Sequence, residues 1–87
     1  MTKQLEALRE KINLIDAEII EKLAERQRLV KQIGEIKSQY GQAVLDTSRE
    51  AQLFEYYKTL CEQHQLDPVF VRQLFEIVFV YSRELQK

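Results

Sequence analysis

The feature that most constrains the fold is an unbroken helical pattern over the first 39 residues. Apolar residues recur there at helical spacing, namely Leu5, Leu8, Ile12, Ile15, Ile19, Leu23, Val30 and Ile33. No proline interrupts this segment, and the first clear break comes in YGQAV, at Gly41. We therefore predict one helix over residues 3–39, about 55 Å long at 1.5 Å per residue.

Two shorter helices are predicted for the rest of the chain. Asp46 or Thr47 can cap a second helix that runs to about residue 64. Asp67 is a candidate N-cap for a third helix, and Pro68 suits its first position. The 87 residues contain only two glycines and one proline and show no strand-like alternation. The sequence thus predicts a single all-α domain, residues 1–87, of one long and two shorter helices.

Composition and charge exclude several classes of function. Thirteen Lys and Arg residues against fourteen Asp and Glu give a net charge of −1, which supplies no broad basic field for a nucleic acid. No apolar run approaches the length of a membrane span. The N-terminus MTKQLEALREK lacks the apolar core of a signal peptide, so we expect a cytoplasmic protein.

No residue pattern indicates a metal, a cofactor or covalent catalysis. Cys61 is the single cysteine, has no evident partner base, and is best interpreted as a packing or surface residue. His64 lies in a polar segment without further ligands at metal-binding spacing. No glycine-rich phosphate loop is present. We expect no metal and no cofactor.

The unequal helix lengths predict a partner chain. The second and third helices, each about 27 Å long, cannot cover the whole apolar stripe of the first. The third helix is apolar around much of its circumference, through Val69, Phe70, Val71, Leu74, Phe75, Ile77, Val78, Phe79 and Val80. Such a helix is normally buried on nearly all sides. We expect an obligate homodimer in which the two long helices cross or pair.

Two cations interrupt the apolar stripe of the long helix. Continuing the helical spacing predicts apolar residues at positions 26 and 37, where the sequence has Arg26 and Lys37. Asp16 lies about 15 Å away along the helix, too far to pair with Arg26 within one chain. These charges could set helix register or oligomeric state. Alternatively, a ligand supplies the counter-charge that burial requires.

Four further residues extend this set of polar candidates. Arg49 and Glu50 fall in the first turn of the second helix, where the helix dipole favours anions, and Thr47 to Glu50 also matches a capping box. Ser82 and Gln86 are four residues apart on one face of the third helix. They could join helices or orient a ligand.

Arg9 suggests that each site is shared between subunits. It precedes Arg26 by 17 positions, about 25 Å along a straight helix, so one small molecule cannot contact both within one chain. If Arg9 serves the same pocket, it comes from the partner subunit. Together with Lys37 and Arg49, these cations predict a small, multiply anionic ligand such as a dicarboxylate. Chemistry there would depend on orientation and electrostatic stabilisation.

Four segments carry a family resemblance: LREKINLID, LAERQRLVKQIGEIK, VLDTSRE and VRQLFEIVFVYSRELQ. In this order they resemble the all-helical chorismate mutases of the AroQ class, over essentially the whole chain. The likeness is to the small bacterial domain that occurs alone or fused to prephenate dehydratase. It implies an intertwined homodimer that converts chorismate to prephenate by a Claisen rearrangement. That reaction belongs to the shikimate pathway of aromatic amino acid biosynthesis.

The resemblance also implies a role for each candidate residue. Arg26 and the partner subunit's Arg9 would hold the two substrate carboxylates. Lys37 would bind a carboxylate and the ether oxygen. Gln86 would hydrogen-bond the same oxygen, where negative charge builds as the C–O bond breaks. Because Gln86 cannot ionise, we expect activity to persist at neutral and mildly alkaline pH.

The remaining positions concern the substrate ring. Glu50 and the backbone near Asp46 would hold the ring hydroxyl, while Arg49 and Ser82 match the other ligand-contact positions of the family. The main alternative on this fold is an isochorismate-pyruvate lyase, which Glu50 disfavours. A partner-dependent or non-catalytic regulatory domain and a coiled-coil interaction module are further alternatives.

Overall fold

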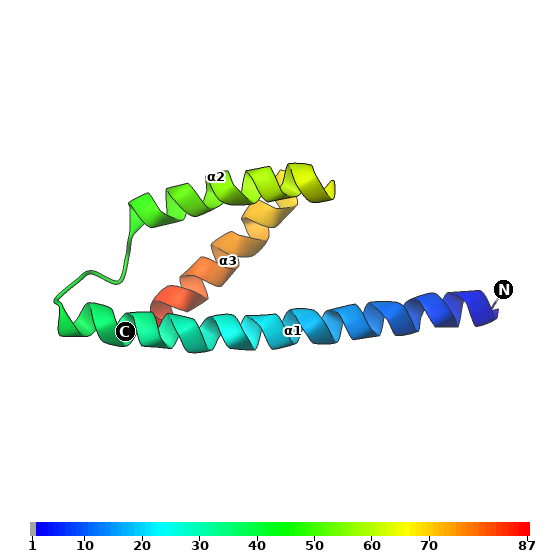
Figure 1. The fold of residues 1–87 in the computed structure, drawn as a ribbon, viewed down its shortest axis with the longest axis horizontal. Coiled ribbons are helices and arrows are strands. Elements are labelled where there is room, and N and C mark those ends of the chain that lie inside the picture. Colours follow the sequence, from blue (N-terminus) through cyan, green and yellow to red (C-terminus); the bar gives the residue numbers. More distant parts are fainter. Residues whose placement is uncertain (1) are drawn as a thin grey trace.

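The structure, a computed structural model, describes residues 2–87 and contains three helices at the predicted positions. They are α1 (Thr2–Gln39), α2 (Thr47–His64) and α3 (Pro68–Gln86). All regular structure in this part of the chain is helical, which confirms the all-α fold class. Figure 1 shows α3 running diagonally from the end of α2 back to the C-terminal part of α1. Helix α3 packs against both other helices, whereas α1 and α2 do not pack against each other.

The end of α1 follows from the predicted glycine break. Gly41 has a φ of 67°, a left-handed conformation that costs glycine little. The backbone N–H of Gln42 then donates to the carbonyl of Lys37, at 2.8 Å. This is the closing hydrogen bond of a Schellman motif, which satisfies a carbonyl of the last turn. The chain therefore leaves the helix after Gln39, two residues beyond Lys37, and turns towards α2.

Both shorter helices begin at an aspartate. The Oδ1 atom of Asp46 accepts a hydrogen bond from the backbone N–H of Arg49 at 3.0 Å, and Asp67 accepts one from Val69 at 2.9 Å. Asp46 is therefore the N-cap of α2, one of the two predicted candidates. The predicted capping box from Thr47 to Glu50 is wrong. Because α2 is capped one residue earlier, the Glu50 side chain is not in the reciprocal position and binds elsewhere.

Only a small core forms within one chain. The buried apolar residues are Val30, Cys61 and Phe79, and rings of α2 and α3 cluster around Phe79. Of the two predicted alternatives for Cys61, packing or surface, the structure shows packing, since the side chain is buried. The radius of gyration is 16.7 Å, whereas a compact chain of this length would have about 12 Å. The chain is elongated because α1 extends far beyond the other two helices (Figure 1).

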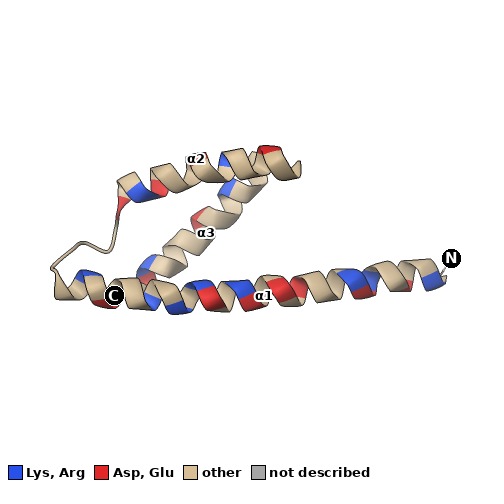
Figure 2. Ribbon diagram, in the orientation of Figure 1, with Lys and Arg blue, Asp and Glu red and all other residues tan. Residues whose placement is uncertain are grey.

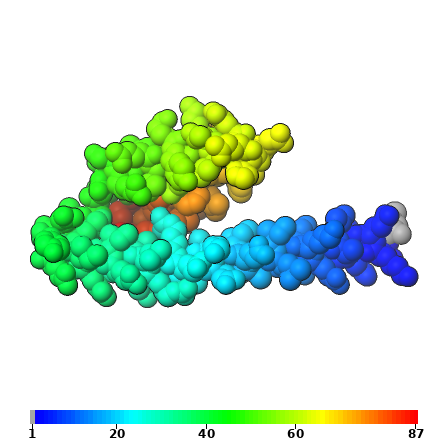
Figure 3. Space-filling view, viewed as in Figure 1, coloured from blue at the N-terminus to red at the C-terminus, as the bar shows by residue number. Residues whose placement is uncertain are grey.

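The N-terminal half of α1 is largely exposed in the single chain. Every residue from 2 to 23 is exposed, including the apolar stripe, of which Leu8 and Ile12 are 57% and 55% exposed. Figure 3 shows this half as a free-standing rod. Helix α3 also exposes apolar side chains, with Ile77 71% exposed, so one chain does not bury it on nearly all sides as expected. A single chain thus leaves a large apolar surface open to another molecule.

Charged residues are distributed along α1 with both signs mixed. Figure 2 shows Lys and Arg interleaved with Asp and Glu over most of this helix, whereas much of α3 carries neither. In the described residues, no helix is sufficiently long and apolar to cross a membrane.

Candidate active site

Seven of the eight predicted site residues line one cavity of about 330 Å³. The C-terminal half of α1, the loop into α2, the first turn of α2 and the end of α3 enclose it. Its predicted members are Arg26, Lys37, Asp46, Arg49, Glu50, Ser82 and Gln86. The eighth residue, Arg9, is exposed on the free half of α1 and does not line it. The chain therefore brings together residues that are up to 60 positions apart.

Arg26 is fixed by the buried hydroxyl of Ser82. Its Nη1 atom donates to Ser82 Oγ at 2.6 Å, and that hydroxyl donates in turn to the carbonyl of Val78 at 2.7 Å. The guanidinium carbon also lies 5.7 Å from the centre of the Phe79 ring, within the range of a cation–π contact. Ser82 is thus oriented by α3 and directs the guanidinium, which keeps further N–H groups for a ligand.

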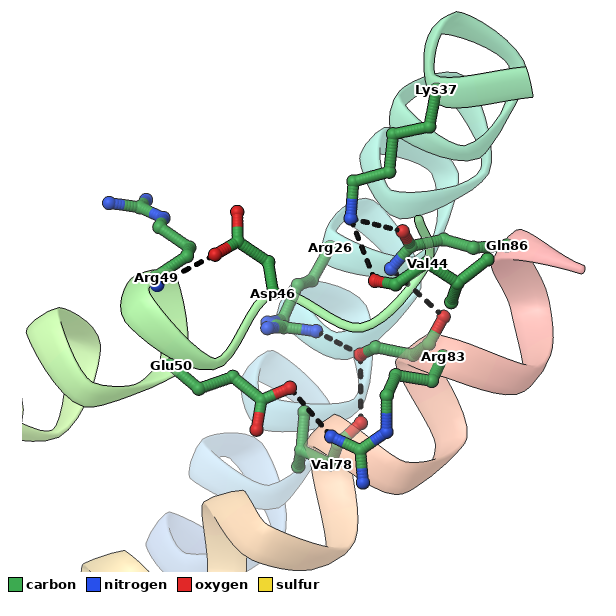
Figure 4. A network of polar contacts seen from close by, with 10 residues as sticks. Arg26, Lys37, Val44, Asp46, Arg49, Glu50, Val78, Arg83 and Gln86 are labelled. Carbon is green, nitrogen blue, oxygen red and sulfur yellow. Dashed lines mark hydrogen bonds and ion pairs between the residues drawn. The ribbon is translucent and has the colours of Figure 1, made fainter. Parts of the chain in front are cut away.

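Lys37 occupies the opposite side of the cavity. Its ammonium donates to the carbonyl of Val44 at 2.9 Å and to Oε1 of Gln86 at 2.8 Å. Figure 4 shows it reaching from α1 to both acceptors. An ammonium has three N–H groups, so one remains for a ligand. The Gln86 amide nitrogen donates to the Ser82 carbonyl at 3.3 Å, which leaves its second hydrogen available.

Arg26 and Lys37 donate to neutral oxygens. Among residues 2–87, none of Arg26, Lys37 and Arg49 forms an ion pair. The prediction that Asp16 cannot serve Arg26 is thereby confirmed. Four cationic and two anionic side chains line the cavity, a formal excess of two positive charges. Since burying uncompensated charge is costly, this arrangement favours a ligand with two negative charges.

Arg83 is a cavity residue that sequence reasoning missed. Its Nη1 atom donates to Oε2 of Glu50 at 2.6 Å, which links α3 to α2 across the cavity (Figure 4). Both side chains are about three-quarters buried, at 28% and 25% exposure. A signal was available, because Arg83 precedes Gln86 by three residues and so lies close to the same helix face. Arg83 was overlooked because it is on α3. Arg26 and Lys37 were identified because they interrupt the apolar stripe of α1.

Asp46 and Arg49 form an exposed edge of the cavity. The Asp46 carboxylate accepts the Arg49 backbone N–H, so the cap itself occupies part of the anion-favouring helix end. In Figure 4 the Arg49 guanidinium points away from Lys37 and Gln86. Arg49 therefore belongs to the entrance of the cavity in this conformation, where its flexible side chain can reach an incoming ligand.

Tyr57 is the remaining titratable residue beside the site, and its phenol is neutral. Burial raises the pKa of Tyr57, and the nearby positive charge of Arg26 partly opposes this increase. Tyr57 packs between Phe75 and Phe54 in the α2–α3 ring cluster. His64 is exposed at the end of α2, away from the cavity. No three potential metal ligands converge anywhere in residues 2–87.

The fold and cavity define an all-helical domain with a cation-rich cavity, and comparison with known proteins gives the family. The family described as chorismate mutase type II matches residues 8–87. A chorismate mutase of Methanocaldococcus jannaschii is 34% identical over 87 residues, all of this chain and 88% of that protein. The chain belongs to the type II chorismate mutases, which confirms the resemblance read from its sequence.

Bifunctional proteins are also similar to the chain. The chorismate mutase/prephenate dehydratase of Escherichia coli K12 is 38% identical over 72 residues, 83% of this chain and 19% of that protein. The corresponding protein of Buchnera aphidicola from Acyrthosiphon pisum is 34% identical over 79 residues, 91% of this chain and 20% of that protein. The chain thus spans about a fifth of the length of these two relatives.

Proposed function

We propose that the cavity between α1, α2 and α3 catalyses the isomerisation of chorismate to prephenate, the activity of a chorismate mutase. One observation carries this proposal. Arg26 and Lys37 converge on one cavity without an anionic partner, beside the hydrogen-bonding groups of Ser82 and Gln86. Chorismate supplies two carboxylates and an ether oxygen, which match this set of donors.

The rearrangement places few chemical demands on the protein. It is unimolecular, breaks one C–O bond, forms one C–C bond and needs no proton transfer. The enzyme must hold a flexible dianion in its compact reactive conformer and favour the polarised transition state over the ground state. Arg26, directed by Ser82, holds one carboxylate in this scheme. No cofactor is needed for such a reaction.

Lys37 and Gln86 act at the ether oxygen. Negative charge develops on this oxygen as the C–O bond breaks, and the free N–H of Lys37 and the amide N–H of Gln86 donate to it. Their mutual hydrogen bond of 2.8 Å places both groups together before the ligand arrives. Donors that are already oriented cost little reorganisation in the transition state. These two residues therefore carry most of the rate enhancement in this scheme.

Glu50 and the backbone around Asp46 bind the ring hydroxyl. One carboxylate oxygen of Glu50 is occupied by Arg83, while the other receives no hydrogen bond from residues 2–87 and can accept from a hydroxyl. Arg49, at the entrance, adds attraction for the dianion and closes over it when it is bound. This arrangement orients the ring relative to Lys37 and Gln86.

A second copy of the chain covers the exposed half of α1. Pairing of two long helices would cover the stripe that contains Leu8 and Ile12, and would bring the partner subunit's Arg9 to the second carboxylate. Light scattering of the purified protein tests this assembly, with twice the chain mass expected. We keep the cytoplasm as the expected compartment, which cell fractionation tests.

Product analysis tests the activity itself. Purified protein is incubated with chorismate and separately with isochorismate, and the products are identified by chromatography. Prephenate from chorismate, with little pyruvate from isochorismate, is expected. Efficient pyruvate release from isochorismate would instead indicate the lyase. A folded protein that turns over neither compound would be a partner-dependent or non-catalytic domain, contrary to the proposal.

A further inference from the structure

The Arg83–Glu50 ion pair is the polar link between α2 and α3 at the cavity. Glu50 lies in the first turn of α2, and Arg83 lies one turn before the end of α3. The aromatic contacts between these helices involve residues further along α2, from Phe54 onwards. Because α1 and α2 do not pack together, the cavity end of α2 is held by α3 and by the loop alone.

The geometry of the pair leaves Glu50 with one defined free acceptor. Arg83 binds Oε2 through Nη1 at 2.6 Å, a short charge-assisted hydrogen bond in a partly buried position. A glutamate has three rotatable side-chain bonds, and an unpaired one would sample many rotamers. With Oε2 fixed, Oε1 is held at one place in the cavity. The positive charge of Arg83 is neutralised by the carboxylate of Glu50.

We propose that Arg83 is a positioning residue that fixes the Glu50 carboxylate for the ring hydroxyl of the substrate. This inference depends on the proposed function. The ring hydroxyl is itself neither formed nor broken in the rearrangement, and on this proposal its hydrogen bond is about equally strong in the ground and transition states. Arg83 therefore contributes to substrate binding, through Glu50, and not to the chemical step.

The test is a double-mutant cycle in the full chain. Arg83→Met, which keeps the packing stem of the side chain, should raise KM about tenfold and change kcat less than about twofold, since uniform binding is lost. Glu50→Gln should also raise KM, and adding Arg83→Met to it should have no further effect. Arg83→Lys should recover most of the affinity. Arg72→Met is the matched control, because it removes an ion pair with Glu76 and a cation contact with the Phe54 ring of α2, outside the cavity.

Each contrary outcome has a distinct meaning. If Arg83→Met leaves KM unchanged, or if its effect persists undiminished in the Glu50→Gln background, Arg83 does not act through Glu50 and the inference is wrong. A fall in kcat with unchanged KM would show a role in the chemical step and would also overturn it. Absence of prephenate formation by the unaltered protein would overturn the proposed function, which the other outcomes leave intact.

Discussion

Gly34 of α1 faces Gln86 of α3 so closely that a Cβ atom added to Gly34 would lie 2.8 Å from the Gln86 Cα. The same atom would lie 3.1 Å from both the Cβ and the carbonyl oxygen of Gln86. The absence of a side chain at position 34 thus permits the last turn of α3 to approach α1. That approach brings the Gln86 amide within 2.8 Å of the Lys37 ammonium.

Gly34→Ala should reduce activity more than stability. The backbone of Gln86 must move to accept the new methyl group, and a displacement near 1 Å at a catalytic group can cost about 100-fold in rate. Overpacking should also lower the free energy of unfolding by about 1–3 kcal/mol. We expect kcat to fall at least tenfold by this argument, measured under conditions where circular dichroism shows a folded protein.

Gly41→Ala is the matched control. Gly41 has open space around it but a φ of 67°, so alanine is strained there by about 1 kcal/mol without touching the site. It should lower stability and leave kcat nearly unchanged. An equal loss of kcat in both variants would mean that the Gly34 effect reflects general destabilisation.

Arg26→Ala and Lys37→Ala should each lower kcat/KM by about 100-fold or more, since each removes a charged donor from a site for a dianion. The oligomeric mass, measured by light scattering, should not change. Arg28→Ala and Lys31→Ala alter exposed residues of the same helix and serve as controls. Loss of the oligomer with little loss of activity per folded chain would favour the coiled-coil module instead.

The pH dependence of activity should be determined by whether the side chain at position 86 can ionise. Glutamine does not ionise, so kcat should stay nearly constant between pH 6 and 8, as steady-state assays can show. Gln86→Glu should be active chiefly at acidic pH, because an ionised carboxylate cannot donate to the ether oxygen and would repel its developing charge. A sharp loss of kcat in the unaltered protein across this range would contradict the role given to Gln86.

Mixing two inactive variants tests whether subunits share each site. Arg9→Ala and Lys37→Ala damage the same pocket from opposite chains. In a mixed dimer, one pocket combines both lesions and the other has none. After co-refolding at equal amounts, half the dimers are mixed, so about a quarter of the unaltered activity should return. No recovery by confirmed mixed dimers would show that Arg9 and Lys37 act in the same chain, and full activity of Arg9→Ala alone would show that Arg9 is dispensable.

Tyr57 should make the fold sensitive to alkaline pH. Its pKa is raised in the folded chain, chiefly by burial, so the folded state keeps this proton more tightly than the unfolded state. The stability that Tyr57 contributes is complete below its ordinary pKa of 10.0 and is lost as pH rises beyond it. Urea unfolding at pH 8 and pH 10.5 should therefore show a smaller pH-dependent decrease for Tyr57→Phe than for the unaltered chain.

Local sequence signals were sufficient for the helices. The bounds of α1, α2 and α3 follow from apolar spacing, Asp46, Asp67, Pro68 and the break at Gly41, because helix ends depend on side chains close in sequence. The cations at positions 26 and 37 were identified by their violation of the apolar stripe. A charge at such a position requires a partner, so the sequence alone already indicated a polar site on an otherwise apolar helix face.

Contacts between distant residues were decided by the tertiary structure alone. The Arg83–Glu50 pair, the Ser82 hydroxyl on Arg26 and the close approach of Gly34 to Gln86 each depend on how α3 crosses the other helices. Crossing geometry arises from the packing of whole helix faces, which no local pattern specifies. Tertiary contacts also bear on the capping box that did not form. Asp46 caps α2, and Glu50 pairs with Arg83, 33 positions further along the chain.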